Sequence, residues 1–198
     1  MTRIINRLYI YYQLSTSVLF LALFARWAVL YPLVSGRFLP GGIHVFLISL
    51  ICYATVGELL WSLKFRRVSG TLKSATLLKD ANLLYFCLAM NHISDYDHSL
   101  VLKNISYSAF IIGLSLSQCY VHATQMFKRG EPLWFSGFLR RVYVYILLPV
   151  MHLSEFNLLL LNVQSSQSIE SPVLDIVHKI VLVFFLPLAC VAWRKAMV

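Results

Sequence analysis

Residues 140–155 read RRVYVYILLPVMHLSE, and this stretch sets the interpretation of the whole chain. Two arginines open it, an apolar run with Pro149 in its middle follows, and the carboxylate of Glu155 ends it. An ionisable side chain within a membrane span is costly, so it is a candidate functional residue by default. We therefore expect a membrane-spanning helix here, with the rest of the chain serving as its scaffold.

The composition is that of an integral membrane protein. Of the 198 residues, 59% are hydrophobic and only 13% are charged, and the mean hydropathy is +0.73. These values exclude an ordinary soluble domain and a disordered chain, and the length fits a single domain. The net charge of +9 does not indicate nucleic-acid binding, because the basic residues lie between apolar stretches and not on one continuous face.

Six stretches are long and apolar enough to be candidate spans, since crossing a bilayer takes about 20 residues. The third is the weakest because it is short and contains Lys79 and Asp80. The sequence thus predicts an all-α bundle of six transmembrane helices in one domain, over approximately residues 11–31, 43–63, 76–91, 106–127, 142–161 and 173–193.

The basic residues predict how this bundle is oriented. Most of them fall on one side of the six predicted spans, which places both termini on that positive side. That side is the cytosol for the endoplasmic reticulum, or the matrix for the mitochondrial inner membrane. The residues on it are Arg3, Arg7, Lys64, Arg66, Arg67, Lys73, Lys128, Arg129, Arg140, Arg141, Arg194 and Lys195.

Three ionisable residues in the predicted spans are candidates for chemistry. His152 lies one helical turn before Glu155, so the two can hydrogen-bond on one face. The alternative for His152 is a structural role as a hydrogen-bonded histidine of the core. The alternative for Glu155 is a position at the far membrane–water interface. Glu58 is expected to pair with a basic residue of a neighbouring helix.

Two further motifs lie in predicted loops. His92, Asp95, Asp97 and His98 form a ligand-rich cluster without fixed metal spacing, so we interpret it as a solvated loop and expect no metal site and no cofactor. Asn104-Ile105-Ser106 is a glycosylation sequon on the side opposite the termini. Its modification would place the protein in the secretory pathway.

The layout resembles the very-long-chain 3-hydroxyacyl-CoA dehydratases, also called protein tyrosine phosphatase-like A proteins. The matching features run in order along the whole chain. They are Tyr12-Gln13-Leu14, Leu30-Tyr31-Pro32, Glu58 with a basic run and Ser69, Lys128-Arg129-Gly130-Glu131-Pro132, an arginine at 140 or 141, Leu147-Leu148-Pro149 and Glu155.

The resemblance implies a six-helix membrane fold that removes water from 3-hydroxyacyl-CoA in fatty-acid elongation. That reaction needs an acid and a base, which the family supplies as a tyrosine before the proline and a glutamate after it. Here Glu155 matches the glutamate, but Leu148 occupies the tyrosine position. Tyr145 lies three residues before Leu148, about 4.5 Å along the helix axis. Tyr145 and His152 are the residues that could replace the missing tyrosine.

Other departures indicate the same loss of catalytic groups. Lys79-Asp80-Ala81-Asn82 replaces the family's polar stretch in the third span, and Gln118 stands where the family has a glutamate in the fourth. We therefore expect a catalytically inactive relative of the dehydratases that acts as a structural, lipid-contacting subunit of a larger membrane assembly. Its expected location is the mitochondrial inner membrane or the endoplasmic reticulum.

The expected partners are other membrane protein subunits and anionic phospholipids such as cardiolipin. The residues expected to contact lipid headgroups are Arg66, Arg67, Lys128, Arg129, Arg140 and Arg141. Two alternatives remain: an active dehydratase of the endoplasmic reticulum, and a small transporter or proton pathway that uses Glu58, Glu155 and His152.

Overall fold

The computed structural model describes residues 3–72, 75–91, 101–127, 136–165 and 172–197. Within these ranges every regular element is helical, and there is no strand. The elements in chain order are α1 (Arg3–Leu72), α2 (Ala75–Asn91), α3 (Ile105–Phe127), α4 (Ser136–Val142), the π-helix η1 (Tyr143–Leu147), α5 (Leu148–Ser165) and α6 (Pro172–Met197).

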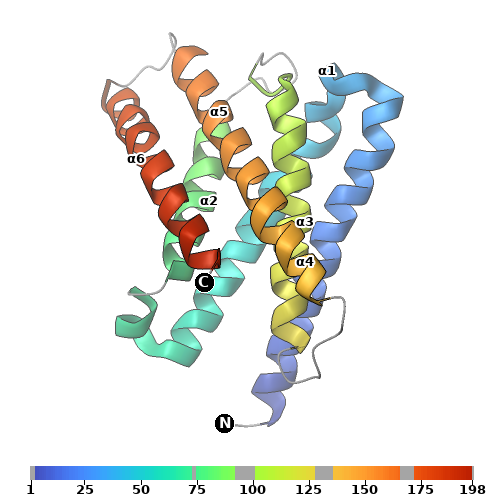
Figure 1. Ribbon diagram of the computed structural model, residues 1–198, viewed down its shortest axis with the longest axis vertical. Coiled ribbons are helices and arrows are strands. Elements are labelled where there is room, and N and C mark those ends of the chain that lie inside the picture. Colours follow the sequence, from blue (N-terminus) through green and yellow to red (C-terminus); the bar gives the residue numbers. More distant parts are fainter. Residues whose placement is uncertain (1–2, 73–74, 92–100, 128–135, 166–171, 198) are drawn as a thin grey trace.

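The first element, α1, is a helical hairpin (Figure 1). Its first arm covers residues 4–34, its second arm covers residues 38–65, and the helical assignment continues through the reversal. Pro32 and Pro40 flank the reversal, and a proline inside a helix removes a backbone hydrogen bond and kinks the axis. The arms pack tightly beside the reversal, where a Cβ on Gly42 would lie 2.9 Å from Cδ1 of Leu30.

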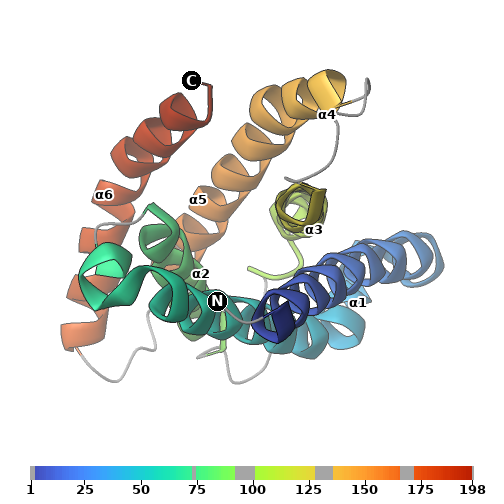
Figure 2. The same ribbon diagram turned by 90° about the horizontal axis from the view of Figure 1, so that it is seen from below.

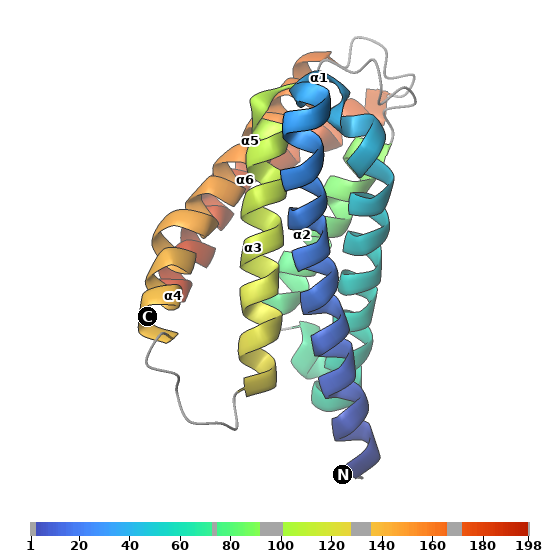
Figure 3. The same cartoon turned by 90° about the vertical axis from the view of Figure 1, so that its right-hand side faces the viewer.

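The segments that follow run alternately down and up beside this hairpin (Figures 1 and 3). α3 lies in the centre and packs against both α1 and α5, and Figure 2 shows it end-on between them. Its buried face carries Tyr107, Phe110, Ile111 and Leu114, all fully enclosed. Gly113 allows α5 to approach, because a Cβ there would lie 3.0 Å from the backbone of Met151.

The predicted span at 142–161 is a composite helix. α4, η1 and α5 follow one another without a break from Ser136 to Ser165. The π-helical turn leaves the carbonyl of Val144 available to α6, where Nε1 of Trp193 donates to it at 2.8 Å. Single π-helical turns within α-helices occur often at functional sites, and here the turn fixes the end of α6 against the bundle.

Helices are present at all six predicted positions, and four of the stretches are long and apolar enough to cross a membrane. These are Ile4–Val34, Phe38–Phe65, Gly137–Gln164 and Ile176–Arg194. α2 has 17 residues, or about 26 Å of helix against a hydrocarbon core of roughly 30 Å. α3 is longer but carries buried Ser106, Gln118 and His122. The prediction of a membrane protein built from helices is confirmed, and the six-span orientation stays a prediction.

The outermost helices expose most of their apolar surface. In the most apolar part of the first and last candidate spans only 11% of the residues are buried, against 39% in the other two. Val18, Val29, Val183 and Phe184 are each more than half exposed. Such surfaces face lipid tails or other membrane proteins, because water would not stabilise them.

Candidate functional site

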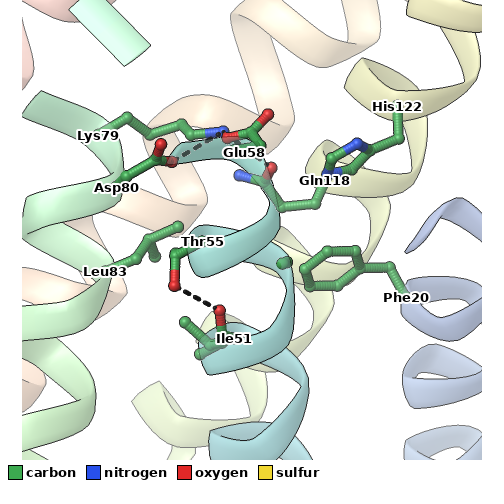
Figure 4. Close-up of a pocket in the computed structure, with 10 residues that line it drawn as sticks. Phe20, Ile51, Thr55, Glu58, Lys79, Asp80, Leu83, Gln118 and His122 are labelled. Carbon is green, nitrogen blue, oxygen red and sulfur yellow. Dashed lines mark hydrogen bonds and ion pairs between the residues drawn. The ribbon is translucent and has the colours of Figure 1, made fainter. Parts of the chain in front are cut away.

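A group of ionisable and amide side chains lies in the interior where α1, α2 and α3 meet (Figure 4). Nζ of Lys79 lies 2.6 Å from Oε2 of Glu58 and 3.6 Å from Oδ1 of Asp80. The same ammonium donates to Oε1 of Gln118 at 3.4 Å. We call Glu58, Lys79, Asp80, Gln118 and His122 the polar cluster.

Apolar side chains close around this cluster. Phe20, Ile51 and Leu83 line it together with the polar residues, and all three are buried. The interior leaves no space for a water-sized ligand among them. Isolated charges in such surroundings are very costly, and pairing offsets part of that cost. The ammonium of Lys79 therefore supplies the positive charge that pairs with both carboxylates.

A chain of hydrogen bonds continues from the polar cluster toward the start of α1. Nδ1 of His122 donates to Oε1 of Gln13 at 2.5 Å, and Nε2 of Gln13 donates to Oε1 of Gln125 at 2.9 Å. The hydroxyl of Tyr9 donates to the same Gln125 oxygen at 2.7 Å. These bonds join the first arm of α1 to α3 over about one helical turn. Buried polar networks of this kind fix one arrangement of the helices.

A second buried carboxylate belongs to Glu155 of α5. It is fully enclosed, and its Oε1 accepts a hydrogen bond from Nδ2 of Asn82 at 2.7 Å. Nδ1 of His152 lies 3.7 Å from the other oxygen, Oε2, which is beyond hydrogen-bonding distance. His152 and Glu155 thus share a helix face as predicted, but the predicted hydrogen bond between them is absent, and Oε2 has no hydrogen-bond donor in the described structure.

The structure does not bring the other proposed acid-base residues to Glu155. Tyr145 lies on η1 with 62% of its surface exposed, whereas Glu155 is completely buried. The side chain of Leu148 is buried in the apolar core. Tyr145 therefore faces the outside of the bundle and not the interior that holds Glu155, so the two cannot act as a pair in this arrangement.

The remaining predicted residues divide between the described and undescribed parts of the chain. The expected pairing of Glu58 with a basic residue of a neighbouring helix is confirmed by Lys79. Arg140 and Arg141 are exposed on α4, which keeps them available to lipid headgroups. The other predicted residues lie outside the described ranges or have undescribed side chains: Arg66, Arg67, Lys128, Arg129, His92, Asp95, Asp97 and His98.

Sequence reasoning missed most of the polar cluster. In sequence, Lys79 and Asp80 only weaken the third predicted span and depart from the pattern of the family that the chain resembles. Their adjacency inside a short apolar stretch was a usable signal, because a charged residue within a span is retained only where it has a partner. The long-range bond between Gln13 and Gln125 has no local signal of this kind.

Comparison with known proteins overturns the resemblance to the dehydratases. The chain is 45% identical over 193 residues to the "Beta-1,6-glucan synthesis-associated protein KEG1" of Saccharomyces cerevisiae. The aligned residues make up 98% of this chain and 96% of that protein. No family model matches the chain. No solved structure matches it either.

The predictions of a dehydratase-like subunit, of an active dehydratase and of a role in fatty-acid elongation are therefore wrong. Each motif that carried the resemblance, such as Leu147-Leu148-Pro149, is short and weak by itself. The 45% identity extends over nearly the full length of both chains, so the chain belongs to the family of the β-1,6-glucan synthesis-associated protein KEG1.

Proposed function

We propose that this protein takes part in β-1,6-glucan synthesis as a membrane component that contacts other proteins of that process. The observation that carries the proposal is the identity of 45% across nearly the whole of both chains. The matched region includes almost all of the sequence that forms the bundle, and the name of the relative associates it with that synthesis.

The exposed apolar faces support a role based on contact. The first and last candidate spans are mostly uncovered, and they lie on the outside of the bundle (Figure 2). Helices associate in membranes by close packing and by a few polar contacts, so such faces are suited to neighbouring transmembrane helices. The polar cluster serves this role by holding α1, α2 and α3 in one fixed arrangement.

The proposed location is a membrane of the secretory pathway. The mitochondrial alternative rests on the start of the chain, which is basic and contains no acidic residue before Glu58. The sequon at Asn104 lies on the predicted side opposite the termini, which in the secretory pathway is the lumen, where such a site can be glycosylated. Glucan synthesis, with which the relative is associated, supplies the second argument for the secretory pathway.

Replacement of the yeast relative tests the proposed function. The full chain is expressed in yeast cells depleted of that relative, and the β-1,6-glucan content of the cell wall is measured. We expect glucan to return toward the undepleted level, because the two chains match from end to end. Cells with an empty vector give the baseline. A chain that is inserted in the membrane at normal abundance and leaves glucan at this baseline would refute the proposal.

A further inference from the structure

The two arms of α1 enclose a groove near the end of the bundle that holds the N-terminus. It offers about 550 Å³, within the roughly 300–1,000 Å³ of small-molecule sites. The second arm contributes residues at positions 53, 56, 57, 60, 61 and 64. This spacing of three and four residues keeps them on one helix face, over a length of about 16 Å.

The walls of the groove are aromatic and are held in place by their neighbours. The hydroxyl of Tyr12 donates to the carbonyl of Ala54 at 2.6 Å, which ties the first arm to the second. Gly57 leaves room for the Tyr12 ring, because a Cβ there would lie 2.3 Å from Cε2 of Tyr12. Trp61 meets Tyr9 edge-on at 5.4 Å between ring centroids. The groove is therefore formed before any ligand arrives.

One charge lies at the end of this otherwise apolar groove. Among the lining residues whose side chains the structure describes, Lys64 is the one that carries a charge, and it is exposed. The neighbouring acid, Glu58, is not available to neutralise it, since Glu58 is turned inward onto Lys79. Lys64 also belongs to the basic residues that mark the predicted positive side of the membrane.

An apolar channel that ends at one cation matches an amphiphile with a long chain and an anionic head. We propose that this groove binds one acyl chain of an anionic phospholipid, with the phosphate of the lipid beside Lys64. A packed helix from another protein would fill the apolar part of the groove, but it would not account for a lone cation at the end. The inference does not depend on the role in glucan synthesis.

Photolabelling of the full chain in lipid nanodiscs tests the proposal. The discs contain phosphatidylcholine and a small share of phosphatidylserine that carries a diazirine in its acyl chain, and adducts are mapped by mass spectrometry. We expect labelling of the segment from Tyr53 to Trp61. Phosphatidylcholine with the same diazirine chain should label it less, by about fivefold, which is roughly what one lysine contributes at an anionic membrane surface.

Two pairs of variants separate the groove from general lipid contact. Val56→Trp fills the groove and should reduce labelling severalfold, whereas Val45→Trp, at an exposed position on the same arm outside the groove, should leave it unchanged. Lys64→Gln should abolish the preference for phosphatidylserine, and Lys64→Arg should keep it. Both Val45 and Val56 are exposed, so neither substitution disturbs the core.

Three results would overturn the proposal. The first is equal labelling by the two lipids in the unaltered protein. The second is labelling of the segment that Val56→Trp does not reduce. The third comes from a photo-crosslinking amino acid placed at position 56 in native membranes: an adduct with a protein and not with a lipid would show that a partner helix occupies the groove.

Discussion

The ammonium of Lys79 lies 2.6 Å from a carboxylate oxygen of Glu58, so the start of α2 is paired with the second arm of α1 inside the bundle. The side chains of Glu58 and Lys79 are 10% and 31% exposed, which leaves the pair mostly shielded from water. Removal of one member of such a pair leaves the other charge uncompensated, and this is more costly than loss of the contact alone.

Lys79→Met is therefore expected to destabilise the protein strongly. It leaves Glu58 and Asp80 close together without a cation, and breaking a buried pair costs about 3 kcal/mol at the lower end of the usual range. Thermal unfolding in detergent measures the change. Lys79→Arg is the control, since it keeps the positive charge, and it should lose clearly less stability. Equal losses for both variants would show that the charge of Lys79 does not matter.

The second prediction concerns the hydrogen bond between Asn82 and Glu155. Asn82→Leu removes the donor that lies 2.7 Å from Oε1 of Glu155, and a buried acceptor left without a partner costs about 1–3 kcal/mol. Replacement of both partners by apolar residues of similar shape is nearly neutral. The double variant Asn82→Leu, Glu155→Met should thus be more stable than Asn82→Leu alone, by the same unfolding measurement. Additive losses would contradict this explanation.

Gly57 and Gly137 form a matched pair for a packing test. A Cβ on Gly57 would overlap the ring of Tyr12, whereas one on Gly137 meets nothing within 4 Å. Gly57→Ala should therefore cost about 1–3 kcal/mol through displacement of the ring. Gly137→Ala should stabilise α4 by about 0.5–1 kcal/mol, because alanine loses less backbone freedom in a helix. A Gly57→Ala protein as stable as the unaltered one would mean that the arms of α1 separate easily.

Glycosylation mapping tests the six-span orientation. Acceptor sequons on short flexible inserts are placed after residues 95, 130 and 168 and at the C-terminus, one at a time. The native sequon is removed in all of these proteins by Asn104→Gln. If both α2 and α3 cross the membrane, only the inserts at 95 and 168 become glycosylated in microsomes, since these fall on the side opposite the termini. Glycosylation of the insert at 130 would show that α3 does not cross the bilayer.

The helices of this protein could be predicted from sequence because length and apolarity determine them directly. Each predicted stretch contains a helix, and the first two stretches form the two arms of α1, joined by a reversal through which the helical assignment continues. Contacts between the buried faces of the helices could be predicted only where a charged residue lay within an apolar span. Glu58 required a partner, and its basic partner on a neighbouring helix was correctly expected.

The rest of the site depends on contacts across long separations in the chain. Gln13 and Gln125 are ordinary polar residues in sequence, and only the packing of α1 against α3 brings them together. The direction in which Tyr145 faces depends on packing for a related reason. A count of residues along a helix gives a height on its axis, but the π-helical turn and the neighbouring helices decide which way the side chain faces.

The pairing of Lys79 with Glu58 also bears on how the protein is made. A lysine or an aspartate costs up to about 2.5–3.5 kcal/mol, the value at the centre of an inserting helix, and α2 carries one of each in its first two turns. If α2 left the translocation machinery alone, it would insert poorly into the bilayer. The α1 hairpin leaves the ribosome first and already carries Glu58, so it can receive α2 as a partner. Biogenesis of the bundle would then follow the order of synthesis, with the hairpin as the template for insertion.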